Sequence, residues 1–212
     1  MFLDHGHRVA GSHRGTGVPA GVFGVEADIT NRAQVVQALK DVADHHGPVE
    51  TLIVNAGITD DDLLLRMDEE KIRRVLETNA IGPMIAVKEA LRPLLRSKDG
   101  SIVLVSSASA RYGVPGQANY TAAKGALEGF ARTVAKEYAS KGIRCNVVAP
   151  GGTATDMTSA LTEDQRQTML NDVPLGRLAR PEEIASVIYW VSQSTYMTGV
   201  TVPVTGGAVL GY

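Results

Sequence analysis

Short apolar runs rich in β-branched residues alternate along this chain with longer stretches of helical periodicity, and this alternation restricts the fold more than any other feature. Strands buried in a parallel sheet appear as such runs, and the helices that connect them carry an apolar stripe. The expected strands are residues 9–11, 23–27, 51–54, 101–105, 143–149 and 201–204, and the expected helices are residues 32–45, 69–96, 119–140, 163–171 and 181–193. This order predicts an α/β fold of three layers, in which a doubly wound parallel sheet lies between helices and binds ligands at the carboxyl ends of its strands.

Length and composition favour one domain that spans residues 1–212. Hydrophobic residues make up 44% of the chain, which is enough for one sizeable core. The 21 basic and 23 acidic residues leave a net charge of −2, and no basic block stands out. We therefore expect no nucleic-acid partner and favour a small molecule or a protein.

The cysteine content and the apolar runs point to a cytoplasmic protein. Cys145 is the only cysteine, so no internal disulfide is possible and a reducing compartment is expected. The start of the chain shows no basic leader followed by an apolar stretch, and no run reaches the roughly 20 apolar residues of a spanning helix. The five histidines lack the spacing of metal ligands, so we expect solvated side chains and no metal site.

Three residues carry the chemistry that the sequence suggests. Tyr120 and Lys124 stand four positions apart at the start of an expected helix, so they share one face of it. A tyrosine hydroxyl titrates near ~10, and Lys124 is placed to be the cation that a catalytic tyrosine needs at neutral pH. Ser107, after an expected strand, is placed to donate a hydrogen bond to a carbonyl oxygen that gains charge as hydride arrives. Taken alone, the Tyr–Lys pair would be an ordinary exposed polar pair.

Combined with other motifs, these residues resemble the short-chain dehydrogenase/reductase family. The serine stands thirteen positions before the tyrosine, Asn55-Ala56-Gly57 follows one expected strand, and Pro150-Gly151 follows another. Residues 55–59, 117–120, 147–151 and 155–158 are most similar to the bacterial 3-oxoacyl-[acyl-carrier-protein] reductases of that family. The resemblance covers nearly the whole chain from about residue 9 and implies a Rossmann-like fold.

The resemblance also implies a role for each catalytic residue. Tyr120 would protonate the substrate oxygen, Ser107 would position that oxygen, and Lys124 would also bind the nicotinamide ribose. Asn79 would hold a water molecule in the proton relay. Judged from its helical context alone, Asn79 suggests a local hydrogen bond or an exposed side chain.

Further residues are implied as cofactor contacts. Asn55, Ala56 and Gly57 would lie against the adenine ribose, although an ordinary strand-to-helix turn also fits them. Asp28 and Ile29 would contact the adenine, and Asp28 can equally cap the following helix. The nicotinamide side would be lined by Pro150, Gly151, Thr153 and Thr155.

The first expected strand bears on the choice between NAD and NADP. A carboxylate at its end favours the free ribose hydroxyl of NAD, whereas an arginine accommodates the 2′-phosphate of NADP. The strand is followed by His13 and Arg14 and by no acid, so we predict NADP with these two residues on the phosphate; a solvated basic loop is the alternative.

One part of the family pattern is missing. The glycine-rich turn Gly-x-x-x-Gly-x-Gly is absent from this sequence, and Met1–His5 resembles the last turn of the helix that would follow it, with Gly6 as its stop. The resemblance thus implies that the family's first strand is absent, which would leave residues 9–11 and 51–54 with unpaired backbone groups. We expect an N-terminally shortened form of a functional reductase, or a subunit that has lost its activity.

The function that these observations predict is NADPH-dependent reduction of a 3-oxoacyl thioester, with a dehydrogenase of another secondary alcohol and a catalytically silent subunit as alternatives. Residues 153–175 are expected to form a lid that selects the substrate. An acidic acyl carrier protein would meet basic residues, for which Lys98, Lys141 and Arg111 are candidates, although solvated side chains are the simpler interpretation. A homo-oligomer is expected, with a tetramer favoured.

Overall fold

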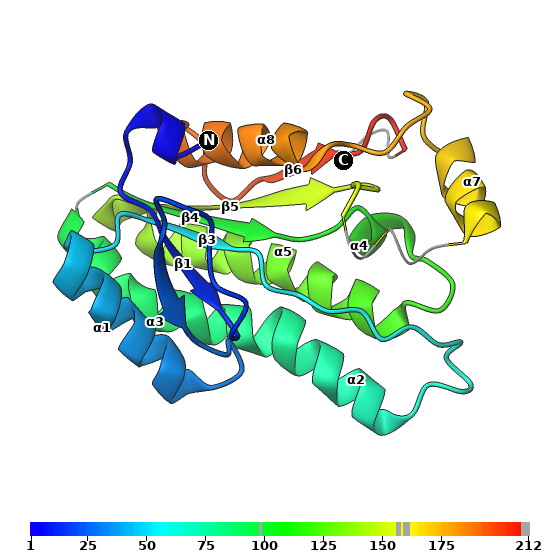
Figure 1. Ribbon diagram of the computed structural model, residues 1–212, viewed down its shortest axis with the longest axis horizontal. Coiled ribbons are helices and arrows are strands. Elements are labelled where there is room, and N and C mark those ends of the chain that lie inside the picture. The colour runs from blue at the N-terminus through cyan, green and yellow to red at the C-terminus, as the bar shows by residue number, and fades with distance from the viewer. Residues whose placement is uncertain (98, 156–157, 159–161, 209–212) are drawn as a thin grey trace.

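The computed structural model describes residues 1–97, 99–155, 158 and 162–208. Parallel strands form the middle layer, with helices on both of its faces (Figure 1). Helix α8 (Pro181–Gln193) and the short helix η1 (Leu3–His5) lie on one side, and α1, α3 and α5 lie on the other. The predicted three-layer α/β arrangement is therefore confirmed.

The strands form two separate parallel sheets rather than one. The larger sheet has the order β3 (Thr51–Val54), β4 (Gly100–Val105), β5 (Ile143–Pro150) and β6 (Thr201–Val204). The smaller sheet pairs β1 (Ala10–His13) with β2 (Phe23–Glu26). All of these lie where strands were predicted, although β1 begins one residue later and runs two residues further than expected.

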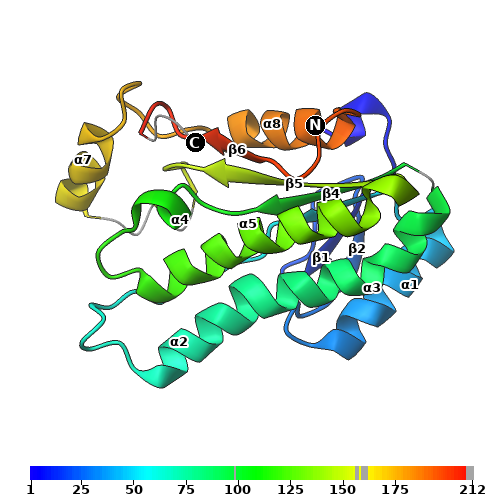
Figure 2. The ribbon, with the colours of Figure 1, turned by 180° about the vertical axis from the view of Figure 1, so that it is seen from behind.

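The helices also follow the predicted pattern, except that one of them is interrupted and a short helix, α4, forms where a loop was expected. Their bounds are α1 Arg32–His46, α2 Glu69–Leu76, α3 Gly82–Ser97, α4 Ser109–Tyr112, α5 Ala118–Tyr138, η3 Ala139–Lys141 and α7 Glu163–Asn171. Asn31 caps α1 by accepting from the N–H groups of Ala33 and Gln34. The single helix expected over residues 69–96 is instead broken by a π-helical turn at Glu77–Ile81. Figure 2 shows α3 and α5 side by side on one face of the larger sheet.

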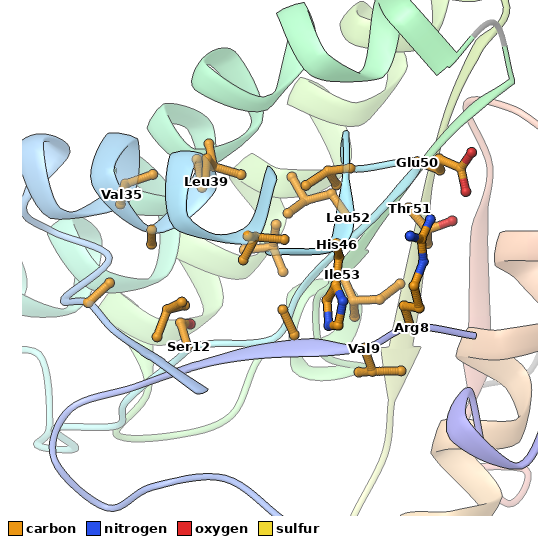
Figure 3. A pocket seen from close by; sticks show the side chains of 18 of the residues that line it. Arg8, Val9, Ser12, Val35, Leu39, His46, Glu50, Thr51, Leu52 and Ile53 are labelled. Carbon is orange, nitrogen blue, oxygen red and sulfur yellow. The ribbon is translucent and has the colours of Figure 1, made fainter. Parts of the chain in front are cut away.

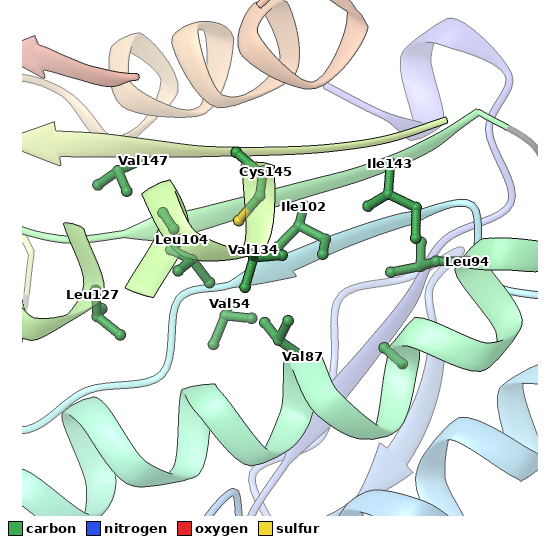
Figure 4. Close-up of a cluster of buried hydrophobic side chains, with 13 residues drawn as sticks. Val54, Val87, Leu94, Ile102, Leu104, Leu127, Val134, Ile143, Cys145 and Val147 are labelled. Atoms are coloured by element: carbon green, nitrogen blue, oxygen red, sulfur yellow. The ribbon is translucent and has the colours of Figure 1, made fainter. Parts of the chain in front are cut away.

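The core lies between the larger sheet and helices α3 and α5 (Figure 4). Every residue of β4 is buried, as expected for the central strand of a parallel sheet. The cluster includes Val54, Val87, Leu94, Ile102, Leu104, Leu127, Val134, Ile143, Cys145 and Val147. Burial raises the pKa of the Cys145 thiol to about 12, so this residue packs as a small apolar side chain, as predicted.

A cavity of about 340 Å³ separates the two sheets (Figure 3). It lies between β1 and β3, which make no ladder with each other, and Val9, Leu52 and Ile53 are among its lining residues. The gap falls where the family resemblance implied a missing strand. His46 lines the cavity with a buried Nε2 atom that has no hydrogen-bond partner among the described residues, so the expectation of a solvated side chain is wrong for this histidine.

The described part of the chain has neither a membrane-spanning helix nor a cluster of metal-binding side chains. None of its helices is long and apolar enough to cross a membrane. The same residues hold no group of three or more histidine, cysteine or acidic side chains arranged to bind a metal ion.

Candidate active site

Ser107, Tyr120 and Lys124 meet at the carboxyl end of β4. Ser107 lies two residues beyond that strand, and Tyr120 and Lys124 occupy the first turns of α5. The Lys124 ammonium lies 5.8 Å from the centre of the Tyr120 ring, and Ser107 is hydrogen-bonded to the Tyr120 hydroxyl. The structure thus brings together the three residues that the sequence singled out.

Lys124 is held deep in the protein. Its Nζ donates to the carbonyl oxygen of Val105, the last residue of β4, at 2.8 Å. Only 3% of the residue is exposed, and this burial lowers the pKa of the ammonium to about 8. Val105 is the one hydrogen-bond acceptor for this group among the described residues, which leaves two of its three N–H donors for a ligand.

Tyr120 keeps its proton at neutral pH. Burial raises the pKa of the phenol above its ordinary value of 10, while the hydrogen bond from Ser107 lowers it; Asp61 and Tyr112 raise it further. The net direction is upward, so the hydroxyl is a proton donor rather than a base in this state.

Asn79 completes the site in a way that its helical context did not indicate. The π-helical turn directs its side chain to Ile58, whose N–H donates to Oδ1 at 2.9 Å and whose carbonyl accepts from Nδ2 at 2.8 Å. Asn79 is fully buried, so the expectation of a local hydrogen bond or an exposed side chain was wrong. A distant partner explains why the residue interrupts the helix.

Gly57 lies between Asn79 and Lys124. A Cβ atom on Gly57 would stand 3.3 Å from Lys124 Nζ and 3.4 Å from Asn79 Oδ1. The glycine therefore keeps open the space that the two polar groups face. Asn55 and Ala56, which precede it, line the cavity between the sheets.

Of the residues predicted for the adenosine end, His13, Arg14 and Asp28 lie at the carboxyl ends of β1 and β2. Arg14 is largely exposed and stands 3.9 Å from the carboxylate of Asp28. Asp28 accepts from the N–H and the hydroxyl of Thr30, which lowers its pKa, so it forms a turn while Asn31 caps the helix. His13 accepts from the Gly15 N–H through Nδ1.

The residues predicted for the nicotinamide end follow β5, which includes Pro150. A Cβ atom on Gly151 would stand 3.0 Å from Thr205 Cα, so the two chain segments approach closely there. Thr153 donates to the Gly151 carbonyl at 3.2 Å. Thr155 accepts through its carbonyl and donates through its N–H to the hydroxyl of Thr158.

Three supporting residues were missed by sequence reasoning. Ser106 donates to the Lys124 carbonyl at 2.9 Å, and Ser109 donates to Ser107. Asn119 accepts from the Tyr120 N–H and donates to the Asp60 carbonyl, which ties the start of α5 to a distant loop. The only available signal was their position beside the three principal residues.

Comparison with known proteins defines the class. Residues 4–209 match the family model described as enoyl-(acyl carrier protein) reductase, and the chain belongs to this family of short-chain dehydrogenases/reductases. Among its relatives, the 3-oxoacyl-[acyl-carrier-protein] reductase MabA of Mycobacterium tuberculosis is 41% identical over 209 residues, which cover 98% of this chain and 85% of that protein. The reductase FabG of Vibrio cholerae is 42% identical over 186 residues, covering 87% of this chain and 76% of its own. FabG of Thermotoga maritima is 40% identical over 196 residues, with 92% and 80% covered.

Proposed function

We propose that this protein reduces a 3-oxoacyl thioester to the 3-hydroxyacyl thioester with NADPH. The observation that carries the proposal is the meeting of three side chains at one site, where the Tyr120 hydroxyl is hydrogen-bonded to Ser107 and the Lys124 ammonium lies 5.8 Å from the centre of the Tyr120 ring. This arrangement suits protonation of a carbonyl oxygen. The names of the relatives support the same reaction, whereas the family model carries the name of an enoyl reductase, which would act on a carbon–carbon double bond.

The residues of the site divide the work as follows. Ser107 donates a hydrogen bond to the substrate carbonyl oxygen, and Tyr120 transfers its proton to that oxygen as charge develops there. The ammonium of Lys124 stabilises the phenolate that remains, and Asn79 holds a water molecule that returns a proton. A nicotinamide dinucleotide bound at this site would provide the hydride equivalent, and together with the proton from Tyr120 this would convert the ketone to an alcohol.

Several residues of this chain fit a nicotinamide dinucleotide. Lys124 has N–H donors free for a ribose hydroxyl, and Gly57 leaves open space beside it. Arg14 is exposed at the end of β1, where, with His13, it would meet the 2′-phosphate of NADP. Asp28, Ile29, Asn55, Ala56 and Gly57 would line the adenosine end, and Pro150, Gly151, Thr153 and Thr155 the nicotinamide end. The glycine-rich turn that would bind the diphosphate is absent from this sequence.

The cavity between β1 and β3 favours a second candidate, a subunit without catalytic activity. Asn55 and Ala56, which are expected to contact the cofactor, line this cavity. An empty cavity gives these residues less support and would therefore weaken cofactor binding. A chimera tests this: a strand, glycine-rich turn and helix from a relative are joined before Met1. Tighter NADPH binding by the chimera would show that the cavity weakens cofactor binding in this chain, and equal binding contradicts this.

The reaction itself is tested by the oxidation of NADPH with an acetoacetyl thioester. We expect turnover that Tyr120→Phe abolishes, and a much slower reaction with a crotonyl thioester, because the site is built around a carbonyl oxygen. A faster reaction with the crotonyl substrate would assign the enoyl reaction instead. No turnover by either the chain or the chimera would favour the silent subunit.

Contacts with an acyl carrier protein are also proposed. Lys98 lies outside the described residues. Arg111 is ion-paired with Glu128 at 2.7 Å, whereas Lys141 is exposed over the Tyr138 ring and is the stronger candidate for an acidic carrier. Lys141→Glu should raise KM for the carrier-bound thioester and leave KM for a free thioester unchanged.

Assembly, location and substrate selection complete the proposal. A tetramer formed partly through α5 is supported by Gly125, where an added Cβ would meet only open space. A cytoplasmic location is supported by the single cysteine, which is buried and free. The lid over residues 153–175 stays a prediction, with residues 156–157 and 159–161 outside the described structure.

A further inference from the structure

Ser109 is a buried serine beside the active site that has no part in the mechanism given above. It begins the short helix α4 and is only 4% exposed. Both of its donors point to one atom: the N–H reaches Ser107 Oγ at 3.2 Å and the hydroxyl reaches it at 2.9 Å. Two hydrogen bonds from one residue to a single hydroxyl oxygen fix that oxygen closely.

The number of hydrogen bonds that the Ser107 hydroxyl can make determines what these two contacts do. A serine hydroxyl has one proton to donate and two lone pairs that accept. The N–H and the hydroxyl of Ser109 occupy both lone pairs. Ser107 therefore has only its proton left to offer, and that proton is directed to the Tyr120 hydroxyl.

The surroundings hold Ser109 in place. The carbonyl of Ser109 accepts from the Gly113 N–H at 2.8 Å, and the Ala108 N–H donates to the Pro150 carbonyl at 2.8 Å. The same short helix is anchored to α5 by the ion pair of Arg111 with the buried Glu128. Helix α4 is thus fixed between the end of β5 and α5.

We infer that Ser109 is a positioning residue that keeps Ser107 a hydrogen-bond donor, toward Tyr120 in the unliganded protein and toward the substrate oxygen when substrate is bound. Without the Ser109 hydroxyl, one lone pair of Ser107 is free and its proton has no single preferred direction. Donation also strengthens along a chain of hydroxyl groups, so Ser107 is a better donor when it accepts from Ser109. This inference rests on the proposed function for its catalytic meaning, but the hydrogen-bond chain exists in the unliganded protein.

The test measures the pKa of Tyr120 without requiring turnover. Protein carrying 13Cζ-labelled tyrosine is titrated by NMR, and the Tyr120 signal is assigned by its loss in Tyr120→Phe. Four forms are compared: the unchanged chain, Ser109→Ala, Ser107→Ala and the double variant. Ser186→Ala, which removes an exposed hydroxyl on α8 that bonds only to its own helix, is the control.

Ser109→Ala should raise the Tyr120 pKa by a few tenths of a unit or more when Ser107 is present and leave it unchanged in the Ser107→Ala background. The charged and titratable groups that face Tyr120 are Lys124, Asp61 and Tyr112, and they are the same in all four forms. An equal shift in both backgrounds, or no shift in either, overturns the inference. A chain that shows the coupling yet reduces no 3-oxoacyl thioester would contradict the proposed function alone.

Discussion

Of the side chains in this site, the buried ammonium of Lys124 has the largest cost of desolvation. Lys124 is 3% exposed, and no carboxylate among the described residues lies within hydrogen-bond distance of its ammonium. Within that part of the chain, its one hydrogen bond is to a backbone carbonyl. Its pKa of about 8 lies well below its ordinary 10.5. A charge kept at this cost is typical of a functional site rather than of a stabilising one.

The pH dependence of stability follows from that pKa. Below about pH 8 Lys124 is protonated in both folded and unfolded states, so the full cost of burying the charge is present, on the order of 3 kcal/mol. Between pH 8 and 10.5 the folded state has lost the proton and the unfolded state still binds it, so the free energy of unfolding rises with pH. Urea unfolding should show a gain on the order of 2 kcal/mol for the unchanged chain relative to Lys124→Met between pH 7.5 and pH 10. Parallel pH profiles for the two proteins would contradict this.

Among single residues, those whose positions follow from short spacings along the chain could be predicted from the sequence. The four-residue spacing of Tyr120 and Lys124 predicted that they share one helix face, and the family resemblance joined Ser107 to them as a catalytic group. The role of Ser109 and the position of Gly57 between Asn79 and Lys124 were not predicted, because they depend on contacts made only after α4 and the loop beyond β3 are in place.

At the element scale, the π-helical turn Glu77–Ile81 is the feature that departs from expectation. Apolar periodicity runs through it without a break, so the sequence predicts one continuous helix. The extra residue in the turn rotates Asn79 toward Ile58 and away from the helical register. Sequence reasoning did not find this partner because it lies 21 positions away.

Removal of the Asn79 side chain should destabilise the protein. Asn79→Ala leaves the N–H and the carbonyl of Ile58 without their partners, at about 1–3 kcal/mol for each group that stays dry. We therefore expect a loss of about 2–4 kcal/mol in the free energy of unfolding measured with urea. Asn171→Ala, at an exposed helical asparagine, should change it by less than about 0.5 kcal/mol. Equal losses in the free energy of unfolding for the two variants would show that the Asn79 contacts do not stabilise the protein.

At the scale of the whole molecule, the sheet is divided into a small unit and a large one. The layers and the parallel strands were predictable, because they follow from the alternation of apolar runs and helices. The cavity between β1 and β3 was predictable only in outline, from the family resemblance, since no local pattern indicates that two strands lack a common neighbour. Small two-stranded sheets are marginal without further packing, and α1 provides most of the packing for this one.

The division predicts uneven stability. Backbone amides of β1 and β2 should exchange hydrogen at least about tenfold faster than those of β4 and β5, because the small sheet can open without disturbing the main core. Hydrogen–deuterium exchange followed by mass spectrometry distinguishes the two sheets peptide by peptide. Equal protection in both would mean that they unfold as one cooperative unit despite the cavity.

In the proposed reaction, Tyr120 delivers a proton to the oxygen of a carbonyl substrate. The most direct measurement is NADPH oxidation with an acetoacetyl thioester by the chain, by the chimera extended before Met1, and by each with Tyr120→Phe. We predict turnover that falls by a factor on the order of 100 or more in the Tyr120→Phe forms, with their folded structure intact. Turnover that is unchanged by Tyr120→Phe would contradict the assignment.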